Sequence, residues 1–208
     1  MTHNRSSEEL AMRDMLVAWG RKRWPDARVF HELTIETCRI DLAFITPTNL
    51  IGIEIKSSKD TLDRLDKQIE VFCDHLPVVY VAHHQKWTDK IAHGSRLEVF
   101  LNDDGPVKSG VYEHGWKPDR INWRVYTRLL DILWADELRA IGNRHLFGFT
   151  KKSTMGHMLP VLAAKLTGEQ ILHEACHELR GRPTFNLASD AQICERAAAV
   201  PAKAMQLL

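Results

Sequence analysis

Three residues in the first part of the chain, Asp41, Glu54 and Lys56, have the types and spacing needed for chemistry on a phosphate group. They lie in two β-like runs joined by a four-residue connection, residues 46–49. A hairpin with that connection pairs Asp41 directly with Glu54. Opposed side chains have Cβ atoms about 4.5–5.5 Å apart, where two like charges destabilise a sheet unless a cation compensates them.

A divalent cation would fit this pair of acids. Carboxylate oxygens suit Mg²⁺ or Mn²⁺, and waters, a substrate phosphate and the main-chain carbonyl of Ile55 would complete the coordination. Lys56 would then orient or deprotonate an attacking water and offset charge in the transition state. The alternative is a surface salt-bridge cluster on a half-exposed sheet. The strongly apolar flanking runs favour the metal site, because charge buried in such a setting normally has a function.

The elements that position these residues can be predicted from periodicity. A capping box from Ser6 to Glu9 opens a helix that ends near Gly20 and Pro25. A second helix follows Ser57 and Ser58. Strands are predicted at Arg28–Ile35, Arg39–Ile45, Leu50–Lys56 and, after the second helix, Val78–Val81. The predicted fold class is therefore α/β, with the order αβββαβ and a mixed sheet.

Alternation along these strands predicts which face each side chain takes. Arg39, Asp41 and Ala43 should share one face, and Ile40, Leu42 and Phe44 the other. On the next strand Glu54 and Lys56 should point one way, while Ile51, Ile53 and Ile55 point into the core. Two acids and an amine would thus converge on one surface.

The second half changes character. Residues 96–101 could add an edge strand, and residues 102–119 carry most of the loop signals. From residue 125 the pattern is helical, with segments near 125–143, 154–166, 169–180 and 188–199. We therefore expect a core at 1–124 and a C-terminal helical appendage at 125–208, which would bind a partner or position a substrate. It could also mediate formation of a homodimer.

Composition limits the other function classes. The 208 residues have a net charge of +1, so no overall basic field is present and nucleic-acid contacts would need local patches. The longest apolar stretch, residues 76–82, is too short to cross a membrane. The scattered cysteines are expected to be reduced thiols in a cytoplasm, filling the core. The basic candidates are Arg21, Lys22, Arg23, Arg120, Arg124 and Arg128, and the cysteines are Cys38, Cys73, Cys176 and Cys194.

The run Arg39-Ile40-Asp41, a hairpin, and then Glu54-Ile55-Lys56-Ser57-Ser58 resembles the signature of the PD-(D/E)XK, or restriction-endonuclease-like, nucleases. Residues 59–65, Gln68 and 73–76 are similar to the MmcB-like branch, linked to DNA repair, and to related phage and prophage proteins. This resemblance covers residues 6–83. It implies a Mg²⁺- or Mn²⁺-dependent deoxyribonuclease in which Asp41 and Glu54 bind metal, Lys56 is catalytic and Gln68 is auxiliary.

Two details depart from that family pattern or leave a choice open. Ile40 stands where many members have proline. Many members also add a glutamate from the first helix, and both Glu8 and Glu9 fit that position. We favour Glu9, which has the family-like spacing, although the capping box already accounts for it. Glu32 on the first predicted strand is a further candidate, as an acid that would contact the site residues without binding the metal itself.

A different motif, HExxH, occurs at His173-Glu174-Ala175-Cys176-His177 and is typical of zinc metalloproteases. On a helix, its two histidines lie opposite the apolar face and should face solvent. A zinc metalloprotease is therefore a remote alternative. A stronger alternative is a nuclease-like protein that binds DNA or a partner without cutting. The presence of Asp41, Glu54 and Lys56 together favours activity.

Overall fold

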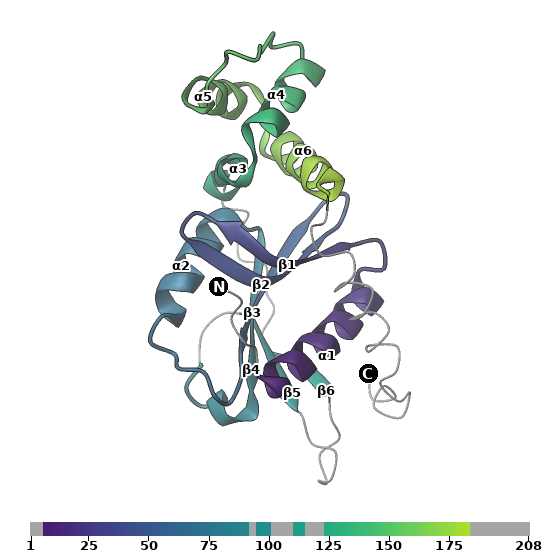
Figure 1. The fold of residues 1–208 in the computed structure, drawn as a ribbon, viewed down its shortest axis with the longest axis vertical. Coiled ribbons are helices and arrows are strands. Elements are labelled where there is room, and N and C mark those ends of the chain that lie inside the picture. Colours follow the sequence, from purple (N-terminus) through teal and green to yellow (C-terminus); the bar gives the residue numbers. More distant parts are fainter. Residues whose placement is uncertain (1–5, 92–94, 101–109, 115–122, 184–208) are drawn as a thin grey trace.

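The computed structural model describes residues 6–91, 95–100, 110–114 and 123–183, and these form a mixed α/β structure (Figure 1). Within these ranges the strands form one six-stranded sheet in the order β1-β2-β3-β4-β5-β6. The elements of the first half are α1 (Ser7–Arg23), β1 (Arg28–Ile35), β2 (Cys38–Ile45), β3 (Leu50–Lys56), α2 (Leu65–His75), β4 (Val78–His84), η1 (Gln85–Trp87), β5 (Ser95–Phe100) and β6 (Gly110–His114). The remaining elements are α3 (Trp123–Leu129), η2 (Leu130–Ile132), α4 (Ala135–Arg144), α5 (Met155–Lys165) and α6 (Gly168–Gly181).

The predicted order αβββαβ and the mixed sheet are confirmed. Strands β1, β2 and β3 pair antiparallel, β4 lies parallel to both β3 and β5, and β6 is antiparallel to β5. The hairpin register is the predicted one, with Ile45 opposite Leu50. The predicted edge strand near residue 96 is instead internal, because β6 pairs with its outer side. That outer strand lies inside the region whose glycines and prolines predicted only loops.

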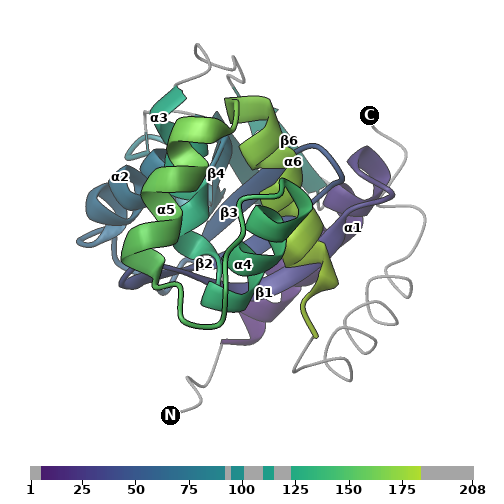
Figure 2. The same cartoon turned by 90° about the horizontal axis from the view of Figure 1, so that it is seen from above.

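Helices cover the sheet on both faces, with α1 on one side and α2 on the other (Figures 1 and 2). Apolar residues of α1, including Met12 and Leu16, pack with Ile51, Ile53 and Ile55, so these three isoleucines point into a core as predicted. The opposite face packs against α2 and the C-terminal helices in a second cluster. Burial on both faces explains the near-continuous apolar runs of β2 and β3.

The C-terminal helices share this second cluster with the sheet. Leu33 and Ile35 of β1 lie in one apolar cluster with Leu129 and Leu130 of the helical region. The segment predicted as one helix at 125–143 is divided into α3, η2 and α4. It divides because Trp134 starts α4 as a cap residue, its main-chain N–H donating to Glu137 at 2.6 Å. The predicted helix at 188–199 lies outside the described residues.

Cysteine burial differs from the expectation of four core thiols. Cys176 is buried, but Cys38 is half-buried and Cys73 is exposed, and all three are free thiols. Cys194 falls outside the described ranges. Of the helices that the structure describes, none has the length and apolar character needed to cross a bilayer.

The close approach of α1 to the sheet gives a test of this packing. A Cβ added at Gly20 would lie 2.2–2.9 Å from three ring atoms of Phe44. Gly20→Ala should therefore lower the free energy of unfolding by about 1–3 kcal/mol through overpacking, outweighing a helix-propensity gain of up to about 1 kcal/mol. Gly156→Ala in α5 is the matched control, because nothing lies within 4 Å of its added Cβ. Urea unfolding should show a loss of stability in Gly20→Ala only. Equal unfolding midpoints for the two variants would contradict the close packing of Gly20 against Phe44.

Candidate active site

The site begins where β2 separates from β3. Their pairing runs from Ile45–Leu50 to Leu42–Ile53. One residue further along β2, the Asp41 side chain takes up the pairing role, because its Oδ2 accepts a hydrogen bond of 2.8 Å from the main-chain N–H of Ile55. Asp41 is thereby fixed to the residue that follows Glu54, whereas the predicted direct pairing of Asp41 with Glu54 lies beyond the last pair of the two strands.

The side chains of β1 and β2 switch from one face of the sheet to the other near Asp41. The β1–β2 pairing passes from His31–Leu42 to Leu33–Ile40, and Glu32 between them has a φ of 60°. The prediction that Ile40 shares a face with Leu42 is wrong: Ile40 packs with Ala43 on the C-terminal-helix side, whereas Leu42 packs on the α1 side. A left-handed backbone at a glutamate is uncommon and is often found at functional sites. Simple alternation could not reveal it.

Glu54, Lys56 and Gln68 are in direct contact. Lys56 Nζ lies 2.9 Å from Glu54 Oε1 and 3.0 Å from Gln68 Oε1, and Gln68 Nε2 donates to Glu54 Oε1 at 2.8 Å. Glu54 is 2% exposed and Lys56 7%. The other oxygen of this carboxylate, Glu54 Oε2, is buried and has no hydrogen-bond partner among the described residues.

Arg13 is a site residue that sequence reasoning missed. Its side chain is fully buried and its Nη2 lies 3.0 Å from Asp41 Oδ1, 3.1 Å from Glu9 Oε1 and 3.5 Å from Glu32 Oε1. Its Nη1 also donates to the main-chain oxygen of Asp41. Glu9 and Arg13 have the i, i+4 spacing of a helical ion pair, a signal that could have identified Arg13.

The two glutamates of α1 lie in different surroundings. Ser6 accepts a hydrogen bond from the main-chain N–H of Glu9 at 3.1 Å, as predicted, and the Glu9 carboxylate lies beside Arg13. Glu8 instead accepts hydrogen bonds from the main-chain N–H and the hydroxyl of Ser58, at 2.8 and 2.5 Å. Burial opposes ionisation of Glu8, but these bonds outweigh it and lower its pKa. Glu8 thus holds the loop after Lys56, and Glu9 belongs to the Arg13 cluster.

Burial of two neighbouring carboxylates sets the electrostatics. Burial and the nearby charge of Asp41 raise the pKa of Glu54 to about 8, against the opposing effect of Lys56. Burial also raises the pKa of Asp41, opposed by Arg13 and by the N–H of Ile55. Without a cation, the pair holds a proton near neutral pH. A divalent cation fits this donor set, because Glu54 Oε2 is unsatisfied and the ligands are hard oxygens.

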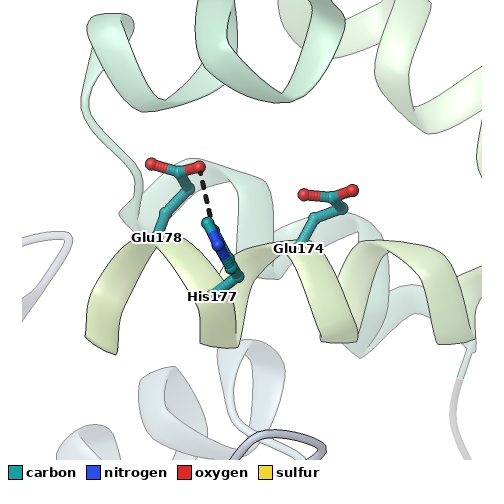
Figure 3. Close-up of side chains that lie close together, drawn as sticks. All are labelled: Glu174, His177 and Glu178. Carbon is teal, nitrogen blue, oxygen red and sulfur yellow. Dashed lines mark hydrogen bonds and ion pairs between the residues drawn. The ribbon is translucent and has the colours of Figure 1, made fainter. Parts of the chain in front are cut away.

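The HExxH motif, residues 173–177, lies on α6 in the C-terminal helical region. His173 and His177 are exposed, so their predicted orientation toward solvent is confirmed. Figure 3 shows Glu174, His177 and Glu178, whose ligand atoms lie within 4.8 Å of one another. Arg144 contacts both of these glutamates, and His145 lies 2.8 Å from Glu174. Burial disfavours the Glu174 carboxylate, but hydrogen bonds from Arg144 and His145 outweigh it and lower its pKa.

A cavity of about 480 Å³ opens between β1 and the start of α4. Its lining includes Glu32, Glu36 and Asp131, together with Trp134 and Arg182. Most of these charges are paired: Arg182 with Glu137 at 2.6 Å, Glu36 with Arg128 at 3.4 Å and Glu32 with Arg13 at 3.5 Å. The charged residues that line the cavity are therefore largely compensated by partners within the protein.

The predicted basic patches are only partly described. Arg21, Lys22 and Arg23 are exposed at the end of α1, where Arg23 stacks on Trp19 and Trp24. Arg128 lies 3.4 Å from Glu36 and forms an exposed ion pair. Arg120 and the side chain of Arg124 lie outside the described part of the chain. Of the two predicted basic patches, the structure therefore describes in full only the one at the end of α1.

The chain is similar to known phage proteins. The family described as bacteriophage P4 protein cII matches residues 2–190. Protein cII of Enterobacteria phage P4 is 27% identical over 175 residues, covering 80% of this chain and 64% of that protein. The chain thus spans less than two thirds of the length of this relative. A structure of a protein of unknown function from Silicibacter pomeroyi covers 73% of this chain and 100% of its own, with 13% identity and a TM-score of 0.38.

The proton held at Glu54 makes stability depend on pH. The folded pKa, about 8, lies above the ordinary value of 4.5, so the stabilisation is complete below about pH 4.5 and is lost as pH rises toward 8. In EDTA, the wild-type free energy of unfolding relative to Glu54→Gln should fall by a few kcal/mol from about pH 5 to 8, at about 1.4 kcal/mol per pH unit. Urea unfolding measures it. Glu70→Gln, on the exposed side of α2, should keep the wild-type slope. Parallel wild-type and Glu54→Gln curves would show that Glu54 holds no buried proton.

Proposed function

The chain belongs to the bacteriophage P4 protein cII family, and we propose that it is a Mg²⁺- or Mn²⁺-dependent nuclease that hydrolyses DNA phosphodiester bonds. The observation that carries this proposal is the group formed by half-buried Asp41 with buried Glu54 and Lys56, in which one carboxylate oxygen of Glu54 is unsatisfied. A carboxylate left without a partner in a buried place is costly unless a ligand satisfies it.

The αβββαβ order supports assignment to the PD-(D/E)XK superfamily as part of the same proposal. In that superfamily the metal-binding acids lie on adjacent strands, as Asp41 on β2 and Glu54 on β3 do here. Lys56 and Gln68 lie in contact with Glu54, which supports the catalytic role proposed for Lys56 and the auxiliary role proposed for Gln68. The ligand role of the Ile55 carbonyl stays a prediction, because the structure gives only its N–H contact to Asp41.

In the proposed reaction, a water oxygen forms the new bond to phosphorus and the bond from phosphorus to the sugar oxygen breaks. Asp41 and Glu54 would hold the divalent cation, which supplies Lewis-acid activation of the phosphate and of the water. Lys56 has three donors, and two of them point at Glu54 and Gln68. The third can contact a phosphate oxygen or the attacking water, where its charge offsets the charge that develops in the transition state.

The described contacts favour the nuclease over the zinc metalloprotease. The glutamate of the HExxH motif is paired with Arg144 and hydrogen-bonded with His145, and its lowered pKa makes it poorly suited to act as a general base for peptide hydrolysis. A binding protein without activity would be recognised by DNA binding without cleavage at saturating Mn²⁺. A role of the C-terminal helices in partner or substrate binding, and a homodimer, stay predictions.

Removing the lysine tests the catalytic assignment. Lys56→Met keeps the length of the side chain but removes its charge and donors, so cleavage of duplex and single-stranded DNA at saturating Mn²⁺ should fall by about 10²- to 10⁴-fold. Lys67→Met is the matched control, because Lys67 is exposed on α2 beside Gln68. The wild type should cut with Mg²⁺ or Mn²⁺ and stop in EDTA. Full cleavage by Lys56→Met, or by the wild type in EDTA, would refute this mechanism.

Removing the aspartate tests the metal assignment without relying on activity. The folded protein should bind Mn²⁺ more tightly than the unfolded chain, so Mn²⁺ should raise the melting temperature of the wild type. In Asp41→Asn this rise should be mostly lost, because one anionic ligand is gone. Asp66→Asn, an exposed position of α2, should retain it. If instead His173→Ala abolishes the shift and Asp41→Asn does not, the metal centre lies on α6 and the nuclease assignment fails.

A further inference from the structure

The Arg13 cluster, consisting of Arg13, Glu9, Glu32 and Asp41, has a geometry that bears on how many cations the site can hold. Three carboxylates converge on Nη2 of Arg13, at 3.0, 3.1 and 3.5 Å. Converging carboxylate oxygens are also the ligands that a divalent cation takes. In this cluster the cation at their centre is a guanidinium, which is part of the chain and always charged.

Asp41 is the residue that would have to bridge two cations. Nucleases that use two divalent ions hold them about 3.5–4 Å apart, on the attacking and leaving sides of the phosphate. Here Asp41 Oδ1 is bound by Arg13 and Oδ2 by the N–H of Ile55. Glu54, with its unsatisfied Oε2, belongs to the group that contacts Gln68 on α2, whereas Arg13 lies on α1. A cation next to Glu54 and the guanidinium thus approach Asp41 from different elements.

We infer that Arg13 occupies the place of a second divalent cation, so that the site binds one divalent ion per chain. Its guanidinium excludes a second ion by volume and by repulsion, and supplies a fixed positive charge beside Asp41. Arg13 is accordingly a positioning residue: it holds the Asp41 carboxylate and main-chain oxygen together. The inference rests on the proposed function only for the presence of an ion between Asp41 and Glu54.

Counting bound Mn²⁺ on the full chain tests this inference without any measurement of cleavage. Equilibrium dialysis gives the number of ions, and electron paramagnetic resonance distinguishes an isolated ion from an exchange-coupled pair. The wild type should bind one isolated Mn²⁺. Arg13→Met removes the charge and vacates the centre of three carboxylates, so the count should rise to two, with a coupled signal. Arg13→Lys keeps the charge and should bind one. Arg21→Met, on the exposed side of the same helix, is the control and should also bind one.

Each result supports or overturns the inference. Two coupled ions in the wild type would overturn it and leave the proposed nuclease intact, whereas no ion in the wild type would overturn both. A folded Arg13→Met chain that still binds one ion would show that Arg13 does not exclude the second. If circular dichroism shows that Arg13→Met does not fold, the counts of the wild type and Arg13→Lys decide: one ion in each supports the inference, and two in either overturns it.

Discussion

The interaction on which the site depends is the hydrogen bond from the main-chain N–H of Ile55 to the Asp41 carboxylate. It lies where the β2–β3 pairing ends, so a side chain replaces the main chain as the partner of an N–H group that would otherwise be buried and unsatisfied. Moving Asp41 would therefore cost both this bond and the Arg13 ion pair. The constraint that fixes the strand geometry also fixes the first acid of the site.

Burial on both faces of the sheet then determines the electrostatics. Because α1 covers one face and α2 with the C-terminal helices covers the other, charged groups at the strand divergence lose water. Desolvation is the largest cause of the raised pKa of Glu54. Lys56 and Gln68 oppose this rise only in part, and Glu54 Oε2 keeps no partner among the described residues. At this place the proposed divalent cation would compensate the charge of the desolvated carboxylates.

Much of this could be predicted from sequence, because period-two apolar runs and a fixed hairpin length determine register. The pairing of Ile45 with Leu50, and hence the approach of Asp41 to Glu54, follows from such counting. The change of face at Ile40 could not be predicted, since it arises from the backbone of Glu32 on another strand. Strand β6 was also missed, because an outer strand of few residues surrounded by glycine and proline has a weak pattern. Arg13 was missed because its pairing with Glu9 at i, i+4 is ordinary on a helix surface, and its burial is explained only together with partners from other elements such as Asp41.

Two acidic centres in this chain show why a motif is weaker support for a site than the balance of its contacts. Glu174 belongs to a complete HExxH motif, but its carboxylate has the cationic partner Arg144 and a hydrogen bond with His145 within the chain, and its pKa is lowered. Glu54 has a cationic partner on one oxygen only, and its pKa is raised to about 8. A carboxylate whose charge the protein already compensates is stabilised little by a metal ion. A desolvated carboxylate that holds a proton can instead release the proton and bind the ion. By this criterion the proposed catalytic chemistry is assigned to the strands β2 and β3 and not to α6.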